Sequence, residues 1–396
     1  MRYPTREYVA RMPGVDGLQI TFLVGDQMTV CGGMTSIVQL AREMTLAGHD
    51  IRIATICQEL KPERFNLPCQ PLVFPSRDEL IRLLPASDIV IATYWTTAAE
   101  YLPDIRRRSD AVTAYFVQDY EPWFYPELNV EMRRRVGATY LMPEHRIVKS
   151  RWLQDLILSE HGVGSEIVHL GLDLGVFRQR SRAALPRGKW RVVAMARPHE
   201  PHRGFKELVD AIEAIHRRRK DVEFVLFGAR SGELPRDLPF PFDDAGMIED
   251  MQQVADLIGS CDILIDPSHF QGLGRPGLEG MACGTSVVLP AVGGVTEYAR
   301  DEENCLTVPR GEPTAIAAAV LRLLNDQPLR ERLTGAGLET VKRFCHIDEA
   351  KRHLALYQQW IGDKRRSRQG RQGLSSRTDT GLGGMGVPAI RASASR

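Results

Sequence analysis

The stretch Phe270–Thr285 combines glycines, a proline and a carboxylate at a spacing that could bind a phosphorylated ligand. It begins just past Asp262–Asp266, an apolar segment that predicts a buried strand, and open α/β sheets bind ligands beyond the carboxyl ends of their strands. Three glycines let the backbone approach a ligand closely, and Pro276 favours the first turn of a helix, whose free N–H groups attract an anion such as a diphosphate. Glu279 lies in the early turns of this helix. It either faces the ligand or complements the helix dipole, and spacing alone leaves both interpretations open.

A second group of polar residues, Arg197–Gly204, directly follows a segment that predicts another strand. The planar fork of arginine suits bidentate contact with phosphate, so Arg197 and Arg203 could hold a diphosphate as negative charge builds on it. For an isolated arginine, a solvated surface residue would be the first interpretation. His199 and His202 stand among prolines and are expected to be ordinary loop histidines rather than metal ligands. The chain contains no Asp-x-Asp, so a metal-bridged diphosphate is not expected.

In the first half of the chain, Gly32 and Gly33 precede a helical pattern, although a tight turn explains a lone glycine pair equally well. The segment Tyr115–Pro126 is more informative, because an expected strand ends there in a cluster of polar and aromatic residues. That composition is typical of a sugar-binding lip, and an aromatic plug of the core beneath a loop is the alternative. The candidate lip residues are Gln118, Asp119 and Tyr120.

These candidates sit within a repeated alternation of strand and helix patterns. Ile20–Val24, a glycine-containing loop, an apolar stripe from Met34 to Met44 and the strand Ile51–Thr55 are typical of a doubly wound α/β domain. The alternation breaks over residues 171–188 and then restarts, which predicts two Rossmann-like domains facing one cleft. Further strands are expected at Asp88–Thr93, Ala111–Gln118, His145–Val148, Ser165–His169, Arg191–Met195, Val222–Phe227 and Ser286–Pro290. Helices are expected at Arg151–Glu160, Phe205–Arg218, Met251–Gly259, Pro276–Cys283, Thr314–Leu324 and Asp348–Trp360.

Length and composition agree with two soluble domains. The chain has 396 residues, of which 43% are hydrophobic, and its net charge of +1 argues against bulk nucleic-acid binding. Eight basic and two acidic residues give Asp363–Arg396 a net charge of +6, and this segment has almost no large apolar residue. The seven cysteines form no Cys-x-x-Cys pair, and neither a signal-peptide core nor a membrane-spanning run is found. We therefore expect a cytoplasmic protein, with peripheral contact to the inner face of a membrane left open.

The stretch Phe270–Thr285 resembles the donor-site signature of retaining glycosyltransferases of family 4, which have the GT-B fold. Their pattern places two glutamates with seven residues between them and continues into Glu-x-Met-Ala-Cys-Gly-Thr; Gln271 and Glu279 occupy the two carboxylate positions here. The resemblance implies that Glu279 holds the ribose hydroxyls of a nucleotide sugar. The first carboxylate of the family contacts the transferred sugar, and Gln271 departs from the pattern at that point.

The resemblance also assigns roles to the other candidates. Arg197 and Arg203 match the basic pair that grips the donor diphosphate, although the second residue is usually lysine. The segment Tyr115–Pro126 looks like the matching part of bacterial rhamnosyltransferases that build rhamnose polymers, whereas other members often carry histidine at the strand end. The expected catalytic residues are Arg197, Arg203 and Gln271, and the expected donor-binding residues are Gly32, Gly33, Ile248, Gly272, Leu273, Gly274 and Glu279.

The residue composition predicts an N-terminal arm over 1–17 and a disordered basic tail over 363–396. Between them, the resemblance implies an acceptor domain over 18–175, a donor domain over 176–347 and a helix over 348–362 that returns to the first domain. The implied activity is transfer of a sugar from a nucleoside-diphosphate donor to a carbohydrate or lipid-linked glycan acceptor, with retention and without metal or other cofactor. dTDP-rhamnose is the leading choice of donor. A GT-B nucleotide-sugar epimerase and a non-catalytic protein that binds sugar nucleotides or glycans remain as alternatives.

Overall fold

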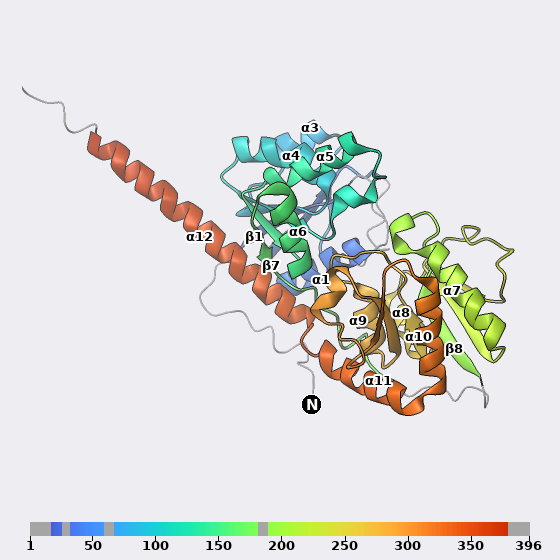
Figure 1. Cartoon of the computed structure of the whole chain (residues 1–396). Coiled ribbons are helices and arrows are strands. Elements are labelled where there is room, and N and C mark those ends of the chain that lie inside the picture. The colour runs from blue at the N-terminus through green and yellow to red at the C-terminus, as the bar shows by residue number, and fades with distance from the viewer. Residues whose placement is uncertain (1–16, 26–31, 59–66, 181–188, 379–396) are drawn as a thin grey trace, which may run out of the picture.

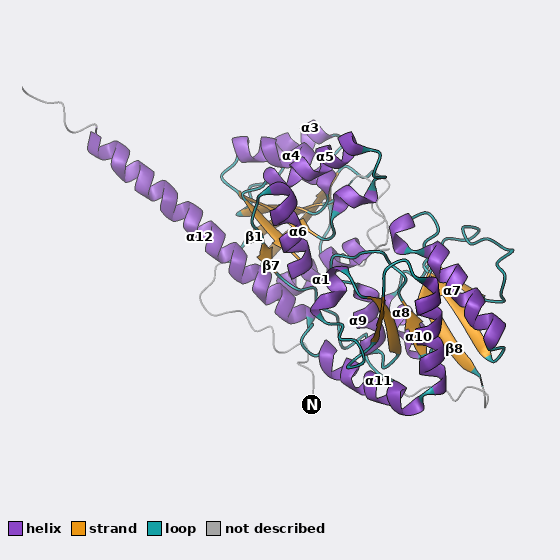
Figure 2. Cartoon of the chain, in the orientation of Figure 1, coloured by secondary structure: helices purple, strands orange, loops and turns teal. Residues whose placement is uncertain are grey.

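The computed structural model describes residues 17–25, 32–58, 67–180 and 189–378, with the side chains of the last helix described as far as residue 369 (Figure 1). Two parallel-sheet α/β domains follow one another along the chain, and Figure 2 shows helices in front of the strands of both sheets. Residues 1–16 of the predicted N-terminal arm and residues 181–188 of the predicted linker lie outside the described residues.

The first sheet has the strand order β3-β2-β1-β4-β5-β6-β7 in the described part of the chain, and all of its pairings are parallel. Helices cover a parallel sheet on both faces, so its inner strands are apolar throughout. The strand β5 is an example, since every residue of Val112–Val117 is buried. The strands are β1 Gln19–Leu23, β2 Asp50–Thr55, β3 Leu72–Val73, β4 Ile89–Ala92, β5 Val112–Val117, β6 His145–Val148 and β7 Glu166–Ile167.

The second sheet repeats this topology with the order β10-β9-β8-β11-β12-β13 among the residues described. In both sheets the strand order reverses beside the first strand, between β1 and β4 and between β8 and β11. Such a reversal opens a crevice at the carboxyl ends of the strands, where ligands of this fold class bind. The strands are β8 Trp190–Met195, β9 Val222–Phe227, β10 Asp243–Gly246, β11 Ile263–Ile265, β12 Ser286–Pro290 and β13 Leu306–Val308.

The helices that connect the strands pack on the two sheets. Those of the first domain are α1 Gly32–Leu46, α3 Arg77–Leu83, α4 Trp95–Arg108, α5 Val130–Ala138 and α6 Arg151–His161. Those of the second domain are α7 Phe205–Arg218, α8 Met251–Gly259, α9 Arg275–Ala282, α10 Pro313–Asn325 and α11 Gln327–Val341. Short 3₁₀ helices span Glu121–Phe124, Thr139–Leu141, Pro201–Arg203 and Gly293–Glu297.

The last helix, α12 (His346–Thr378), crosses back and packs on the first domain. Backbone hydrogen bonds of 2.8 and 3.1 Å join Leu172 to Phe344 and His346 at the crossing, so the two chain passages between the domains lie side by side. Five apolar residues of α12 join the core formed by β1, β4, β5 and α1, and Figure 1 shows the helix running along this domain and projecting beyond it. They are Ala350, Leu354, Tyr357, Trp360 and Ile361.

The prediction of a disordered tail from residue 363 is wrong for residues 363–378, because α12 continues through them to Thr378. Arginine, lysine and glutamine are good helix formers, and a single glycine such as Gly362 costs an interior helix position only about 1 kcal/mol. The first domain also supplies anionic partners, since Lys364 donates to Glu144 at 3.0 Å and Arg365 pairs with Asp88 at 2.8 Å. Residues 379–396 lie outside the described residues.

Two truncations of α12 should differ sharply in thermal stability. Ending the chain at Asp363 removes ion pairs such as Lys364–Glu144 and Arg365–Asp88, whose side chains are half-buried or exposed and which contribute about 1 kcal/mol or less each. Ending it at Ile347 also removes Tyr357 and Trp360, which are buried in the first domain's core and each stabilise it by about 1.5–3 kcal/mol. We expect a melting temperature close to that of the full chain for the first truncation and a large decrease for the second. Equal melting temperatures for all three proteins would contradict this account.

Within the described residues, no helix combines the length and the apolar content that crossing a lipid bilayer requires.

Candidate active site

A cavity of about 670 Å³ lies between the two domains, at the carboxyl ends of both sheets. Its walls are the segments that follow β1, β4, β5 and β6 in the first domain and β8, β9 and β11 in the second. A concave site of this size at two facing strand-order reversals is where a ligand of this fold class would bind. The predicted site residues that line it are Gly32, Gly33, Gln118, Asp119, Arg197, Arg203, Ile248, Gln271, Gly272, Leu273, Gly274 and Glu279.

The loop between β11 and α9 borders the cavity and touches the first domain. A Cβ atom on Gly272 would lie 2.0 Å from the carbonyl oxygen of Gln118, so only glycine allows this contact between the domains. Gly274 caps the N-terminus of α9 with a φ of 90°, a backbone conformation that residues other than glycine rarely adopt. The first residues of α9, Arg275 and Pro276, line the cavity as well. The free backbone N–H groups at the start of α9 therefore border the cavity.

Glu279 is held by its neighbour one helical turn earlier. The Arg275 Nε atom donates to Glu279 Oε1 at 2.6 Å, and only 5% of the Glu279 side chain is exposed. Burial raises the pKa of the Glu279 carboxyl, while the positive charges of Arg275 and Arg197 oppose that rise. In the described part of the chain, Arg275 Nη1 is a buried donor without a hydrogen-bond partner. Glu279 is thus a desolvated carboxylate at the cavity wall, paired through one of its two oxygens.

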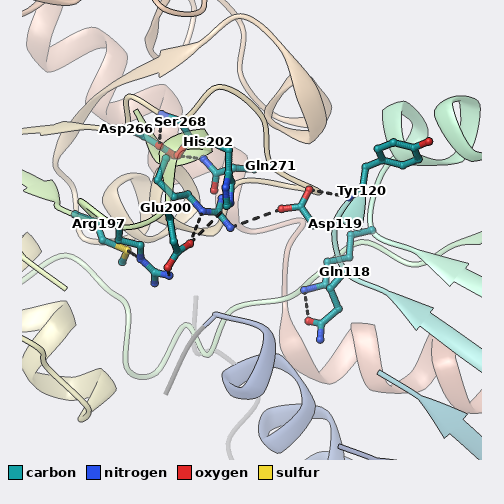
Figure 3. A network of polar contacts seen from close by, with 12 residues as sticks. Gln118, Asp119, Tyr120, Arg197, Glu200, His202, Asp266, Ser268 and Gln271 are labelled. Carbon is teal, nitrogen blue, oxygen red and sulfur yellow. Dashed lines mark hydrogen bonds and ion pairs between the residues drawn. The ribbon is translucent and has the colours of Figure 1, made fainter. Parts of the chain in front are cut away.

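Gln271 forms a hydrogen bond that its sequence position did not reveal. Its amide nitrogen donates to Asp266, the residue that follows β11, and Asp266 also accepts from the backbone N–H of Ser268 at 3.1 Å (Figure 3). Both Asp266 and Gln271 are buried and both line the cavity. The side chain of Gln271 is therefore fixed by a carboxylate beneath it.

The two arginines predicted to hold a diphosphate lie in one chain of ion pairs that crosses the cavity (Figure 3). Glu200 lies between them, with its carboxylate 3.0 Å from Arg197 Nη1 and 3.5 Å from Arg203 Nε. Arg203 Nη2 also forms an ion pair with Asp119 Oδ2 of the first domain, at 3.6 Å. Burial works against ionisation of Glu200, yet Arg197 and Arg203 together hold its pKa below the ordinary value. Carboxylates therefore pair with both guanidinium groups.

Gln118 and Asp119 follow β5 and meet the second domain, but each has a protein partner. Gln118 Oε1 accepts from Lys149 Nζ at 2.8 Å, and Asp119 Oδ1 accepts from the backbone N–H of Tyr120 at 2.9 Å. Burial raises the pKa of Asp119, and Arg203 opposes the rise. Asp119 thus links the two domains at the floor of the cavity.

Tyr120 does not line the cavity, and the prediction that it belongs to a sugar-binding lip is wrong. Its hydroxyl lies 3.0 Å from His161 Nε2, and its ring packs against Tyr140 and Trp123 at centroid distances of 6.0 and 5.0 Å. Asp119 lies in a bend that follows β5, and the buried Tyr120 side chain packs inside the first domain whereas Asp119 lines the cavity. The aromatic-plug interpretation holds for this residue.

Solved structures share this two-domain architecture over nearly the whole of their length. A sucrose-phosphate synthase of Thermosynechococcus elongatus superposes with a TM-score of 0.71 at 20% identity, covering 87% of this chain and 99% of that one. Anabaena HepE in complex with UDP and glucose superposes with a TM-score of 0.70 at 15% identity, covering 85% and 98%. The fold is GT-B.

The sequence of the second domain of this GT-B protein has recognisable relatives. Residues 189–326 match the family model described as glycosyl transferases group 1. A phosphatidyl-myo-inositol mannosyltransferase of Mycobacterium leprae is 29% identical over 187 residues, or 44% of this chain and 48% of that protein. A D-inositol 3-phosphate glycosyltransferase of an Arthrobacter species is 34% identical over 174 residues, or 40% and 41%. The chain spans less than half the length of these curated relatives.

Sequence reasoning missed five charged residues of the GT-B cavity: Glu200, described above with the two arginines, and Lys149, Asp266, Arg275 and Glu121. Lys149 and Asp266 each directly follow an apolar strand, and a polar residue at that place is a usable signal for a site. Arg275 stands four residues before Glu279, the spacing at which oppositely charged side chains pair on a helix.

Glu121 is the remaining missed charge. Its Oε2 atom accepts from the Tyr115 hydroxyl and the Trp95 backbone N–H, both at 2.7 Å. Burial raises its pKa to about 8, so near neutral pH much of this side chain is protonated. Its two hydrogen bonds tie the start of α4 to β5, which gives this cavity residue a structural role in the first domain.

Replacing Glu200 by glutamine should strengthen binding of a nucleoside diphosphate to the GT-B cavity. The carboxylate pairs with Arg197 and Arg203, and a ligand phosphate that takes both guanidinium groups must displace it. Because 41% of the Glu200 side chain is exposed, each of the two pairs is worth less than about 1 kcal/mol, so the gain from both together should stay within about 30-fold. Isothermal titration with UDP, GDP and dTDP measures it. A loss of affinity would mean that Glu200 holds the arginines in place for the ligand.

Proposed function

We propose that this GT-B protein is a glycosyltransferase that moves a sugar from a nucleoside-diphosphate donor to a carbohydrate acceptor. The observation that carries the proposal is the convergence of Arg197, Arg203 and the N-terminus of α9 on one interdomain cavity. Two guanidinium groups and a helix N-terminus form a binding surface for a diphosphate. The group 1 glycosyl transferase match over residues 189–326 supports the same conclusion.

In the proposed complex the second domain binds the donor. Arg197, Arg203 and the backbone amides of Gly272–Gly274 hold the diphosphate, and Glu279 accepts hydrogen bonds from the ribose. Ile248, a half-buried residue beside the core of the second domain, packs against the nucleotide. Gly32 and Gly33, at the start of α1, face the diphosphate from the first domain.

We propose that the reaction proceeds with retention and without a metal ion. As the bond between sugar and diphosphate breaks, negative charge grows on the leaving oxygens, and Arg197, Arg203 and the α9 N-terminus stabilise it from fixed positions. The acceptor hydroxyl would attack from the face that the diphosphate leaves, and a diphosphate oxygen would take its proton. The acceptor would enter from the first domain, past Gln118 and Asp119.

We also propose an identity for the donor sugar and a class for the acceptor. The segment Tyr115–Pro126 is the basis for proposing rhamnose, with dTDP-rhamnose as donor. One relative is named a mannosyltransferase, and the structure of HepE contains UDP and glucose, so mannose and glucose donors belong in the same comparison. The arginines at 106–108 and 133–135 are the basis for proposing peripheral contact with anionic lipid that carries a glycan acceptor.

The test is a donor panel on the full chain. We expect one of dTDP-rhamnose, UDP-glucose and GDP-mannose to raise the melting temperature, to be turned over with a glycan acceptor, and to remain active in EDTA. Nuclear magnetic resonance of the product reports the anomeric configuration and so tests retention. Tight binding without transfer or hydrolysis would instead favour a non-catalytic binding protein, and interconversion of the free donor would favour an epimerase.

A further inference from the structure

Gln271 and Asp266 form a buried pair at the part of the cavity where we propose that the sugar binds. The family signature has a glutamate at position 271, and this chain has a neutral amide there. The amide nitrogen of Gln271 donates to Asp266 Oδ2, and Asp266 Oδ1 accepts from the Ser268 backbone N–H at 3.1 Å (Figure 3). Asp266 is 4% exposed and Gln271 is 6% exposed, and both line the cavity.

These contacts fix which end of the Gln271 amide faces a ligand. An amide side chain offers one nitrogen that donates and one oxygen that accepts. Asp266 takes one N–H of the amide nitrogen and so fixes the acceptor oxygen Oε1 at the other end of the amide, and none of the hydrogen bonds found among the described residues uses Oε1. A carboxylate would present only acceptor oxygens at this place. The amide, when held by Asp266, offers a sugar hydroxyl an acceptor oxygen as a glutamate would, and it keeps a second N–H donor that a glutamate lacks.

The neutral side chain at position 271 also avoids placing two buried negative charges in contact. A glutamate at position 271 would lie against Asp266, and two carboxylates in contact in a buried site cannot both ionise without a large cost. Glu279 is a third carboxylate nearby, since the charge of Asp266 helps to raise the pKa of Glu279. With glutamine at 271, the pair carries one negative charge, which is located on Asp266.

We propose that Asp266 is a positioning residue that takes over the charge of the missing glutamate and orients Gln271 to accept a hydrogen bond from the donor sugar. This inference rests on the proposed function, because it assumes that the cavity binds a nucleotide sugar. Asp266 acts through Gln271, and the two residues form one unit.

Three isosteric variants test this unit: Gln271→Glu, Asp266→Asn and the double exchange Asp266→Asn with Gln271→Glu. The single Gln271→Glu change places two carboxylates in contact, so a shared proton must hold them together. The ratio of its affinity for the nucleotide sugar to the wild-type affinity at the same pH should fall by about tenfold or more as the pH rises and that proton is lost. The single Asp266→Asn change removes the charge and should weaken binding by a few fold, about 3- to 10-fold.

The double exchange restores one carboxylate and one amide, with the carboxylate now at position 271. It should recover affinity to within about threefold of the wild type and lose the pH dependence of Gln271→Glu, because the energies of contacting residues are not additive. The measurements are titrations with dTDP-rhamnose, UDP-glucose and GDP-mannose, and with dTDP, UDP and GDP alone. The bare diphosphates should bind all variants within about twofold of the wild type, since the pair contacts only the sugar.

Asp301→Asn is the matched control, because it makes the same change on an exposed loop of the same domain outside the cavity. It should leave every affinity unchanged. If the wild type binds a nucleotide sugar but the double exchange stays as weak as Gln271→Glu, the positioning role of Asp266 is overturned and the proposed function stands. If the wild type binds none of the six probes, both proposals are overturned.

Discussion

Replacing both Arg197 and Arg203 by alanine should lower the affinity for a nucleoside diphosphate by about 100-fold or more. Both side chains line the cavity, and each lost charge-assisted hydrogen bond removes about 1.5–3 kcal/mol. Each single alanine variant should lose about half of that free energy. Titration calorimetry with the diphosphate that binds the wild type tightest gives the values directly.

The exchange should leave the protein folded, because the side-chain hydrogen bonds and ion pairs of both arginines lie at the cavity, with Met195, Glu200 and Asp119. Arg310→Ala is the matched control, since Arg310 is an exposed arginine of the same domain that does not line the cavity. It should bind like the wild type. Unchanged affinity in the double variant would show that the diphosphate binds elsewhere.

Glu279→Gln should weaken nucleotide binding by about 1–3 kcal/mol, because an amide offers one acceptor oxygen to the ribose where a carboxylate offers two. The wild-type affinity should also depend on pH. Burial raises the pKa of the Glu279 carboxyl, and the proposed contact needs the ionised form, so affinity should fall as the pH drops through that raised pKa. Arg275→Leu removes the nearest positive charge. The pKa of Glu279 then rises further, and the loss of affinity should begin at a higher pH.

The ligand's own phosphate also titrates in this range, so the useful quantity is the ratio of wild-type affinity to Glu279→Gln affinity at each pH. That ratio cancels the ligand's titration and isolates the carboxyl at position 279. We expect it to approach one at low pH, and to do so at a higher pH when Arg275→Leu is compared with Arg275→Leu/Glu279→Gln. A ratio that does not change with pH would remove Glu279 from the binding site.

The fold could be predicted where the chain is apolar and regular. The fully buried β5, Val112–Val117, is a continuous apolar run, and the strand–loop–helix rhythm around it gave the doubly wound topology of both domains. The strands β3, Leu72–Val73, and β10, Asp243–Gly246, were missed because they are short edge strands, and β10 has the polar sequence DDAG. The helix α11, Gln327–Val341, was missed because glycines interrupt its weak apolar stripe.

The candidate site could be predicted in part, because loops after parallel strands meet at one edge of a sheet. That rule was enough to predict that Arg197 and Gln271 lie close together, and both line the cavity. The contacts between side chains were not predictable in the same way. The ion pair of Asp119 with Arg203 joins residues from different domains. The hydrogen bond from Gln271 to Asp266 depends on the conformation of the loop between β11 and α9. Neither arrangement has a local pattern in the sequence.

The return of α12 to the first domain sets the order in which the two halves of the molecule can be completed during synthesis. The sheet of the first domain leaves the ribosome early, but Leu354, Tyr357 and Trp360, which close its core, emerge after the whole second domain. The second domain is contiguous from Trp190 to Val341 and can close its own core first. The first domain is therefore synthesised first but completes its core last. Until α12 is synthesised, the face of the first domain that α12 covers stays exposed on the nascent chain, and a chaperone that recognises apolar surfaces would bind there.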